Sequence, residues 1–375
     1  MKKILSFLII VLLCTQITVY AEPETDAKSV ILIEQSTGKV LFENNPDERL
    51  PIASVTKIMT MLLIMEAIED GRITLDDMVS VSENAMSYGG STMFLEAGEK
   101  LSVSDMLKGI AVASANDGCV AMSEYLEGSE SSFVEKMNQK AKELGMENTN
   151  FMNTNGLDED NHYSSARDVA IMSRELLKYN KIFDYTTIWI DQLRDGKFQL
   201  ANTNKLIRFY NGANGLKTGS TSKALCCISA SAKRDDMQLI AVVLGAPTSA
   251  KRFSSAKALL DYGFANYRIE QVCKANEEIG EITVKKGLSD KVKYCVNESY
   301  SVLKEKKDSK KTEYKIEIDE SIFAPITVGD KVGVIKIPTE NGEHEIELVA
   351  TVDVKKKNLN LFFEDYLDVL LGKKN

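Results

Sequence analysis

The sequence predicts a mixed α/β (α+β) protein: a larger domain with helices around an antiparallel sheet, a small all-β domain after it and an amphipathic helix at the C-terminus. Three observations support this prediction. Strand-like segments stand at both ends of residues 29–265, with helical segments between them. From about residue 270 the chain alternates apolar and polar residues, as half-buried strands do. Residues 359–371 have the apolar spacing of one helix face.

The N-terminus has the pattern of a targeting signal. Lys2 and Lys3 precede an apolar run over residues 4–19, and Ala21 ends a small-residue site before Glu22. This arrangement is typical of a secretory signal peptide, and the run is too short for a permanent membrane span. We therefore expect residues 1–21 to be a signal peptide and the rest of the chain to be exported.

The larger domain begins with a predicted hairpin. Residues 29–43 read as two apolar strands, VILIE and KVLFE, joined by a Ser-Thr-Gly turn. Residues 51–71 then predict a helix that is apolar on nearly every side, as is typical of a helix buried inside a domain. Ser102 and Asp105 resemble the capping box that starts a further helix. Helical patterns continue at residues 117–127, 131–144 and 166–179.

A strand pair and a helix complete this domain. Residues 225–232 (LCCISASA) and 237–246 (MQLIAVVLGA) predict apolar strands separated by a polar turn. Residues 249–265 predict the last helix. We therefore expect the domain to occupy residues 22–268.

Residues 269–354 predict the small all-β domain. Segments such as EITVKKG and KVGVIKI alternate apolar and polar residues, and Asn341-Gly342 between two of them indicates a tight hairpin. The run of charges at residues 304–313 is typical of a solvated loop. Since this part contains no constellation of reactive side chains, we expect the chemistry to lie in the larger domain.

Residues 355–375 predict a separate tail. The apolar face of its helix consists of Leu359, Phe362, Phe363, Tyr366, Leu367 and Leu370, and lysines flank both ends. A helix of this length measures about 20 Å, less than the roughly 30 Å hydrocarbon core of a membrane. The tail therefore predicts an amphipathic anchor lying on a membrane surface. The alternative is a helix packed on the protein itself, and the acidic residues on its polar face weaken the electrostatic argument for an anchor.

The composition excludes some classes of function. The formal net charge is −9, and no clustered basic face indicates a nucleic-acid binder. The two histidines, His162 and His344, lie far apart, and no C-x-x-C or H-E-x-x-H pattern occurs, so we expect no metal site and no cofactor. Five of the six cysteines follow the signal peptide, and we expect most of them to be small buried apolar residues.

One Ser-x-x-Lys pair stands in a chemically favourable position. The pattern occurs five times, but only Ser54 and Lys57 lie at the start of the buried apolar helix. Three residues apart on a helix they share one face, so the lysine can reach the hydroxyl. Because an apolar interior disfavours the charged form of lysine, Lys57 is a candidate general base for a Ser54 nucleophile, and the helix N-terminus offers N–H groups to an oxyanion. The alternative is a capping serine followed by an ordinary lysine.

Two further segments carry polar side chains suited to the same chemistry. Ser114 and Asn116 lie in a short break between two predicted helices. Lys217-Thr218-Gly219 is the only such triplet in the chain and directly precedes the predicted strand pair. A lysine and a threonine hydroxyl suit a carboxylate ligand, and glycine allows a substrate to approach the strand closely.

In this order the three segments resemble the Ser-x-x-Lys, Ser-x-Asn and Lys-Thr-Gly motifs of the serine penicillin-recognising enzymes. Ala115 stands where the usual middle motif has aspartate. Segments such as GGSTMFLEAGEKLSVSDMLKG and TNGLDEDNHYSSARD are similar to low-molecular-mass penicillin-binding proteins, the serine D-alanyl-D-alanine carboxypeptidases of peptidase family S11. The resemblance covers nearly all of the exported chain and implies the penicillin-binding/β-lactamase-like transpeptidase fold.

The resemblance also implies a role for each motif residue. Ser54 attacks the peptide bond between two terminal D-alanines and forms an acyl-enzyme, while Lys57 takes its proton. Ser114 and Lys217 relay a proton to the leaving D-alanine. Asn116 holds the substrate amide.

The remaining implied roles concern the substrate carboxylate and the oxyanion. Lys217 and Thr218 face the terminal carboxylate, with Arg252 as a weaker candidate beside them. Backbone N–H groups of Ser54 and Ser220 form the oxyanion hole, and water then releases the shortened peptide. The implied partners are peptidoglycan stem peptides ending in D-Ala-D-Ala, β-lactams as covalent inhibitors and, through the tail, the outer face of the cytoplasmic membrane, with no nucleic acid.

Three other functions share parts of this pattern. A class A β-lactamase uses a separate glutamate to activate the deacylating water, and no Glu-x-x-Leu-Asn follows Asn116. A D,D-endopeptidase of the same fold would cut crosslinks between stem peptides, and the sequence leaves this alternative open. A non-catalytic penicillin- or wall-binding module would not need intact Ser54, Lys57 and Lys217. The sequence therefore predicts a penicillin-inhibited D-alanyl-D-alanine carboxypeptidase.

Overall fold

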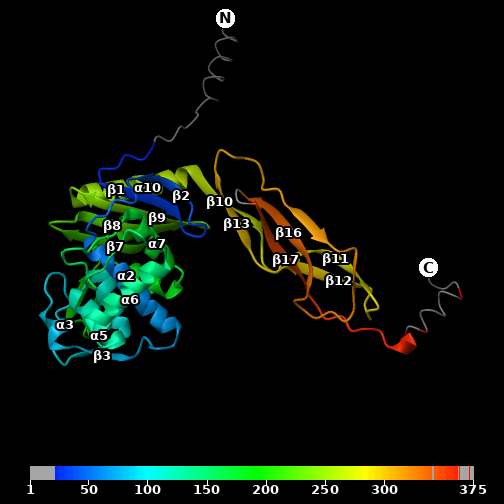
Figure 1. The fold of residues 1–375 in the computed structure, drawn as a ribbon, viewed down its shortest axis with the longest axis horizontal. Helices are drawn as coiled ribbons and strands as arrows, with labels where there is room; N and C mark the ends of the chain where they lie inside the picture. The colour runs from blue at the N-terminus through cyan, green and yellow to red at the C-terminus, as the bar shows by residue number, and fades with distance from the viewer. Residues whose placement is uncertain (1–21, 340–341, 362, 364–370, 372–375) are drawn as a thin grey trace, which may run out of the picture. The chain divides into compact units, whose positions relative to one another are not determined.

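A computed structural model describes residues 22–339, 342–361, 363 and 371 of the chain. The predicted signal peptide and most of the predicted tail helix lie outside these residues. The chain divides after Tyr267 into two compact units, and each is described by itself below (Figure 1).

The larger unit is built on a five-stranded antiparallel sheet in the order β2-β1-β9-β8-β7. The strands are β1 (Ser29–Glu34), β2 (Val40–Asn44), β7 (Ala213–Thr221), β8 (Leu225–Arg234) and β9 (Met237–Ala246). The predicted hairpin is present as β1 and β2, and the predicted strand pair as β8 and β9. Strands β1 and β9 are buried along their whole length, because α10 (Ser249–Asn266) covers one face and α7 (Ala166–Leu176) lies on the other (Figure 1).

A helical part lies beside this sheet, with α2 (Lys57–Glu69) at its centre. All residues from Lys57 to Met65 are buried, as the all-round apolar pattern predicts. The other helices are α3 (Glu83–Ser87), α4 (Val103–Lys108), α5 (Asn116–Glu127), α6 (Glu130–Glu143), α8 (Phe183–Thr186) and α9 (Leu206–Phe209). Ser102 caps α4 by accepting a hydrogen bond of 3.0 Å from the N–H of Asp105, which confirms the predicted start of that helix.

Short elements connect the helices. They are the 3₁₀ helices η1 (Ala53–Thr56) and η3 (Asn180–Ile182), the π-helix η2 (Gly109–Ala113), and the strand pairs β3 (Met78–Ser80) with β4 (Lys100–Ser102) and β5 (Ile190–Leu193) with β6 (Phe198–Ala201). Two of them, η1 and η2, carry the candidate catalytic serines at or next to their ends.

The smaller unit is all-β, as its alternating sequence predicts. Its main sheet has the order β14-β16-β17-β12-β11-β15, and β10 pairs with β13. The strands are β10 (Tyr267–Cys273), β11 (Glu278–Lys285), β12 (Lys291–Val296), β13 (Tyr300–Glu305), β14 (Lys315–Ile318), β15 (Ser321–Phe323), β16 (Lys331–Thr339) and β17 (Gly342–Ala350). Alternate apolar side chains such as Ile335, Ile346 and Leu348 are fully buried and form its core.

Two details of this unit differ from or refine the sequence prediction. The charged run at residues 304–313 was predicted as a loop, but its first two residues belong to β13, where Lys304 is held by Glu270 at 3.0 Å. The predicted hairpin is present, since β16 and β17 pair with Thr339 opposite Gly342, but Gly342 is the first residue of β17 and does not lie between the strands. Asn341 itself lies outside the described residues.

Candidate active site

Ser54 lies in a 3₁₀ turn and not in the α-helix that the sequence predicts for it. The turn η1 ends at Thr56, and α2 begins at Lys57. Ala53, just before the serine, has a φ of 49°, in the left-handed region that a residue with a Cβ seldom adopts. The turn nevertheless presents the Ser54 hydroxyl to Lys57, so the predicted pair is formed by a tighter backbone than expected.

The Lys57 amine is the centre of the site. It is fully buried, and its Nζ lies 2.9 Å from Ser54 Oγ, 2.7 Å from Asn116 Oδ1 and 2.6 Å from the backbone carbonyl oxygen of Asn155. The last two atoms can only accept hydrogen bonds, so they take two N–H groups of the amine. In the neutral amine the remaining position is the lone pair, which then faces the Ser54 hydroxyl. Burial lowers the pKa of Lys57 to about 8, which makes this neutral form accessible near neutral pH.

The Asn155 carbonyl is delivered by a loop that packs directly on the serine turn. Gly156 has a φ of +86°, and a Cβ placed on it would lie 1.9 Å from the carbonyl oxygen of Ala53. Only glycine fits both the backbone conformation and this approach. Next to it, Thr60 donates a 2.6 Å hydrogen bond to the Thr154 carbonyl and ties the loop to α2.

Asn116 links the lysine to a third segment. While its Oδ1 accepts from Lys57, its Nδ2 donates to the Gly89 carbonyl at 2.7 Å, and its backbone N–H donates to the Ser91 carbonyl at 2.7 Å. Ser114 precedes it with a φ of 64°, at the end of the π-helix η2. This left-handed residue makes the break that the sequence predicts between the two helices, and it leaves Ser114 nearly buried in the site.

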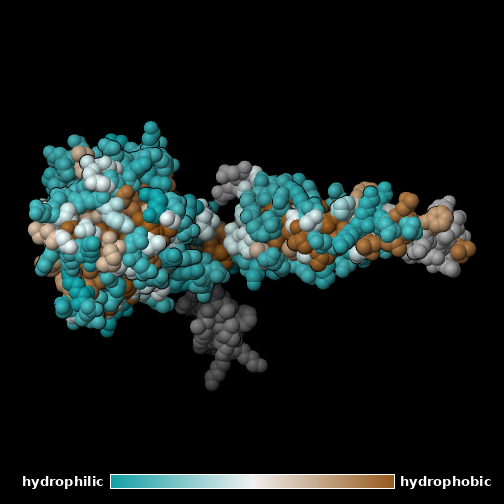
Figure 2. All heavy atoms as spheres, turned by 90° about the horizontal axis from the view of Figure 1, so that it is seen from below, coloured by the Kyte–Doolittle hydropathy of each residue, from teal (hydrophilic) through white to brown (hydrophobic). Residues whose placement is uncertain are grey.

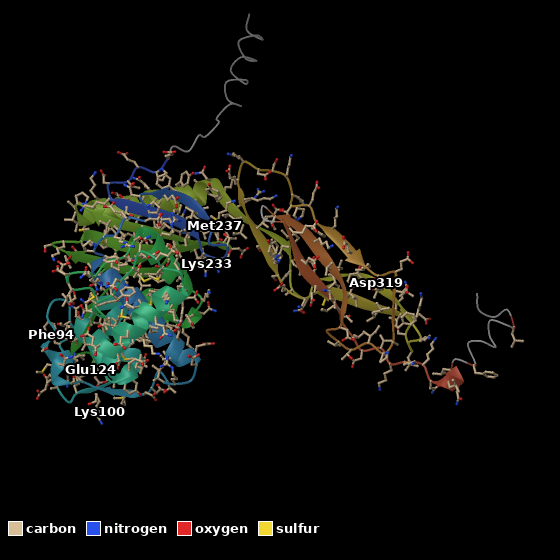
Figure 3. The ribbon with its side chains drawn as sticks, viewed as in Figure 1. Phe94, Lys100, Glu124, Lys233, Met237 and Asp319 are labelled. Atoms are coloured by element: carbon tan, nitrogen blue, oxygen red, sulfur yellow. The ribbon has the colours of Figure 1, made fainter. Side chains whose placement is uncertain are left out.

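The segment around Gly89 is itself fastened at its far end. The buried Asp117 carboxylate accepts hydrogen bonds from the N–H groups of Met93 and Leu95 at 3.1 Å. Arg194 adds hydrogen bonds to the carbonyls of Met93 and Phe94, while the Phe94 side chain stays 72% exposed (Figure 3). The segment from Gly89 to Leu95, which forms one wall of the site, is therefore held by hydrogen bonds between side chains and its backbone.

Lys217, Thr218 and Gly219 lie within strand β7, whereas the sequence placed them just before a strand pair. The pattern was missed because β7 has few apolar residues. Lys217 is buried, and its Nζ donates to the Thr218 carbonyl at 3.0 Å; among the described residues, Ser114 is not one of its hydrogen-bond partners. Burial, followed by the nearby charge of Lys57, holds the pKa of Lys217 well below its usual range.

Gly219 has a structural reason for being glycine besides the close substrate approach that the sequence predicts. A Cβ there would lie 2.8 Å from both the Ile52 carbonyl oxygen and the Ser54 nitrogen. The glycine therefore allows β7 to approach the serine turn.

Arg252 supports the end of β7 from α10. Its guanidinium donates to the carbonyl of Gly219 at 3.1 Å and to that of Cys227 at 3.4 Å, and the residue is buried. Ser220, the next residue on β7, is exposed beside it. The structure thus brings all nine predicted site residues to one region, where the Arg252 guanidinium and the amines of Lys57 and Lys217 can complement an anionic ligand.

Comparison with known proteins decides the family. Residues 16–248 match the peptidase S11 family, described as D-alanyl-D-alanine carboxypeptidase, and residues 267–356 match the C-terminal domain of penicillin-binding protein 5. The chain is 47% identical over 345 residues to the D-alanyl-D-alanine carboxypeptidase DacF of Bacillus subtilis, which covers 90% of this chain and 88% of that relative. The chain belongs to the S11 family of D-alanyl-D-alanine carboxypeptidases.

Solved structures of the family agree with this fold. Penicillin-binding protein 5 from Haemophilus influenzae superposes with a TM-score of 0.71 at 32% identity, covering 90% of this chain and 99% of that one. Penicillin-Binding Protein D2 from Listeria monocytogenes, in its ampicillin-bound form, superposes with a TM-score of 0.60 at 29% identity, covering 65% of this chain and all of that one. As a member of the S11 family, the chain is a serine peptidase with the penicillin-binding fold and an added all-β domain.

Sequence reasoning missed a carboxylate that joins two walls of the S11 site. Glu130, at the start of α6, accepts the Tyr88 hydroxyl on one oxygen and both the N–H and the hydroxyl of Thr154 on the other, at 3.2 and 2.8 Å. Tyr88 precedes Gly89, and Thr154 precedes Asn155. Glu130 therefore ties together the two segments whose carbonyls orient Asn116 and Lys57, and only their spatial proximity identifies it.

His162 is the second residue that the sequence did not assign to the site. It is buried, with Nδ1 accepting from the N–H of Met152 at 3.0 Å and Nε2 lying 2.8 Å from Thr56 Oγ1. Because Nδ1 is an acceptor, the proton of the neutral ring is on Nε2 and is donated to Thr56. Burial lowers the pKa of His162 to about 4, so the ring is neutral and structural at neutral pH.

The described part of the chain contains no candidate metal-binding cluster and no disulfide. No group of three or more His, Cys, Asp or Glu side chains there could hold a metal ion. The five cysteines of the described residues are all free, and four of them are buried, as the sequence predicts for most of them.

Proposed function

We propose that Ser54 is the nucleophile with which this S11 peptidase removes the terminal D-alanine from peptidoglycan pentapeptide stems. The single observation that carries the proposal is the environment of Lys57, whose two acceptor partners leave the amine lone pair to the Ser54 hydroxyl. A buried lysine with a pKa of about 8 is a competent general base for a serine.

In the acylation step the Ser54 oxygen attacks the carbonyl carbon of the penultimate D-alanine, and its proton passes to Lys57. The N–H groups of Ser54 and Ser220 are our candidates for stabilising the oxyanion. The packing at Gly219 supports this assignment. Strand β7 lies so close to the serine turn that a Cβ added to Gly219 would be 2.8 Å from the Ser54 nitrogen. The scissile C–N bond then breaks, and the leaving D-alanine nitrogen takes up a proton relayed through Ser114.

The substrate carboxylate is assigned to the β7 side of the site. Lys217 and the Thr218 hydroxyl are its direct ligands in this proposal, and an arriving carboxylate would favour the charged form of Lys217. Arg252 is a positioning residue in this proposal and not a direct ligand of the carboxylate, because its guanidinium donates a hydrogen bond to the Gly219 carbonyl. Asn116 has one amide N–H beyond the one given to Gly89, and we assign it to the substrate amide. Water finally hydrolyses the ester and restores Ser54.

β-Lactams are the expected covalent inhibitors, in keeping with the ampicillin-bound form of the Listeria relative. The test is mass spectrometry of the purified protein after penicillin addition, combined with an assay for D-alanine release from a pentapeptide. One penicilloyl group on Ser54, with no adduct and no D-alanine release in Ser54→Ala, would support the proposal. Release of D-alanine by Ser54→Ala would refute it.

Two related activities are separated by direct assays. Cleavage of a crosslinked peptide dimer faster than release of D-alanine would indicate the endopeptidase alternative. Rapid, sustained hydrolysis of nitrocefin would indicate a β-lactamase, whereas a carboxypeptidase should remain acylated.

We further propose that the enzyme is exported and acts at the outer face of the cytoplasmic membrane. The proposal divides the chain into a signal peptide (residues 1–21), the peptidase domain (22–268), the β domain (269–354) and an amphipathic membrane-binding tail (355–375). Among the described residues, no helix has the length and apolar character needed to cross a bilayer. Weaker binding to isolated membranes after deletion of the tail would support the anchor, and unchanged binding would contradict it.

A further inference from the structure

One end of the all-β unit is formed by three loops that are hydrogen-bonded to one another. Leu288 donates its N–H to the carbonyl of Lys355 at 2.8 Å, and Ile326 and Val354 exchange two hydrogen bonds of 2.9 Å. The bonds give the loops fixed neighbours, so their side chains form one continuous surface. We call this surface the loop cap; it consists of residues 285–290, 323–330 and 351–357.

The loop cap has several large apolar side chains that are exposed to solvent and do not contribute to the core of the β unit. Ile326 and Val354 point inward and are buried, so the loops do bury apolar groups where the fold allows it. Four others remain more than half exposed: Leu288 at 55%, Phe323 at 59%, Val328 at 58% and Val352 at 53%. Figure 2 shows hydrophobic side chains at the surface of this unit toward the segment that leads to the C-terminus. Gathered apolar exposure of this kind indicates a contact surface.

Lysines surround these apolar residues. Lys285, Lys286, Lys355 and Lys356 are exposed on the loop cap. The ammonium groups of Lys285 and Lys286 lie 5.8 and 5.6 Å from the centre of the Phe323 ring, so apolar and basic groups are in direct contact.

The acidic residues of the loop cap are engaged within it. Asp353 accepts the N–H of Val328 at 2.8 Å, Asp330 accepts that of Thr327 at 2.7 Å, and Asp290 pairs with Lys357 at 3.6 Å. With five lysines against three aspartates, the cap keeps a net positive charge beside its apolar side chains.

We propose that the loop cap is a second membrane-contact surface, with its apolar side chains entering the interface of an anionic phospholipid bilayer and its lysines facing the headgroups. The proposal rests on the proposed location of the enzyme at the membrane, and it assigns the β unit a direct part in binding there. Apolar residues flanked by lysines are the combination that binds anionic lipid surfaces. The tail (residues 355–375) overlaps the cap at residues 355–357, so the two surfaces are continuous along the chain and can contact the same bilayer. A partner protein could bind the exposed apolar side chains without lysines around them, so the ring of lysines favours an anionic membrane as the occupant of the surface.

A single-tryptophan protein tests insertion directly. Trp189 is the only tryptophan of the chain and lies in the peptidase unit, so the double variant Trp189→Phe/Phe323→Trp reports on the loop cap alone. With vesicles of phosphatidylglycerol and phosphatidylcholine, we expect its emission to shift to shorter wavelength and to be quenched by brominated lipid chains. The matched control is Trp189→Phe/Ile316→Trp, at a 39% exposed position on β14 outside the cap, which should show neither effect. Unchanged emission of the Phe323→Trp protein at saturating vesicles would overturn the proposal.

A binding series with the full exported chain separates the cap from the tail. Phe323→Ser/Val328→Ser should weaken co-sedimentation with anionic vesicles about 10-fold or more, since two apolar side chains no longer insert. The tail variant Leu359→Ser/Phe363→Ser should weaken binding separately. If only the tail variant loses binding, the loop-cap proposal fails and the tail proposal stands; if only the cap variant loses it, the reverse holds.

Two controls keep these outcomes interpretable. Ile316→Ser, outside the cap, should bind vesicles normally. D-alanine release from a soluble pentapeptide should be unchanged in every variant, which shows that the peptidase unit is folded. If the cap variant altered only the self-association of the protein and left vesicle binding unchanged, the surface would be a protein interface and the proposal would be wrong.

Discussion

The pH dependence of acylation is the sharpest consequence of the Lys57 environment. Burial lowers the pKa of this amine from 10.5 to about 8, which corresponds to about 3 kcal/mol of lost preference for the charged form. At pH 7 roughly one molecule in ten then carries the neutral base, about 300 times more than an exposed lysine would supply. If neutral Lys57 takes the Ser54 proton, the acylation rate should rise about tenfold per pH unit below 8 and level off above it.

The measurement is stopped-flow acylation by a saturating chromogenic penicillin between pH 6 and 10. The limiting rate constant should be used, because Lys217 also has a lowered pKa and its charge affects carboxylate binding more than the chemical step. A limiting rate that is already flat from pH 6 to 9 would refute the assignment of Lys57 as the base.

Asn116→Asp perturbs the same step from a known direction. The Asn116 oxygen lies 2.7 Å from Lys57 Nζ, and a carboxylate this close should raise the lysine pKa by about 1 to 3 units. The midpoint of the profile should therefore move to higher pH by that amount. The neutral control Asn116→Ala should react more slowly without this upward shift, and an unshifted Asn116→Asp profile would contradict the reasoning.

Three further predictions concern the surroundings of the site. Gly156→Ala should abolish acylation and lower the free energy of unfolding in urea by more than about 2 kcal/mol, because its Cβ would lie 1.9 Å from a carbonyl oxygen. The matched control is Gly145→Ala, since Gly145 has a similar φ of +73° but nothing within 4 Å of an added Cβ. This control should lose only about 1 kcal/mol of stability and remain active. His162 should make stability fall as the pH drops from 6.5 to 4, by about 3 kcal/mol in total, since the unfolded ring binds a proton in this range and the folded ring does not. His162→Gln should remove that pH dependence, and an unchanged slope would assign it elsewhere. Glu130→Gln should slow acylation about tenfold, because one of its hydrogen-bonded carboxylate oxygens becomes an amide, whereas Glu135→Gln on the exposed side of the same helix should have no effect.

The parts of the fold that were predicted from sequence are those with a strong local pattern. The all-round apolar run of α2, the capping Ser102 and the alternating strands of the small domain each depend on residues that are neighbours in the chain. Strand β7 was missed, because Lys217, Thr218 and Gly219 interrupt any apolar alternation with the residues that the site needs. In β7 the residues that the site needs replace the alternating apolar residues that would mark a strand in the sequence.

The motif residues themselves were identified by their order along the chain, but their partners were not. No sequence signal marks these partners, which are the Asn155 carbonyl, the Glu130 carboxylate and the neutral His162 ring. Every residue has a backbone carbonyl oxygen, and a glutamate that links two segments by hydrogen bonds has the same sequence appearance as an exposed one. Each becomes visible only through a contact between segments far apart in the chain, such as Thr56 with His162. Prediction of such partners requires the packing of the whole domain.

The position of the nucleophile follows from this packing and not from helix propensity. The turn around Ser54 includes Ala53 in a left-handed conformation, which by itself is unfavourable. Two glycines from different segments meet its backbone: Gly156 at the Ala53 carbonyl and Gly219 at the Ser54 nitrogen. Because neither has a side chain, both segments approach closely enough to leave the turn no room to relax. The same two approaches bring in the Asn155 carbonyl that orients Lys57 and the strand that carries Lys217. The contacts that hold the serine in a strained turn are therefore the contacts that assemble its base and its substrate-binding strand, and a substitution that relaxes one should disturb the others.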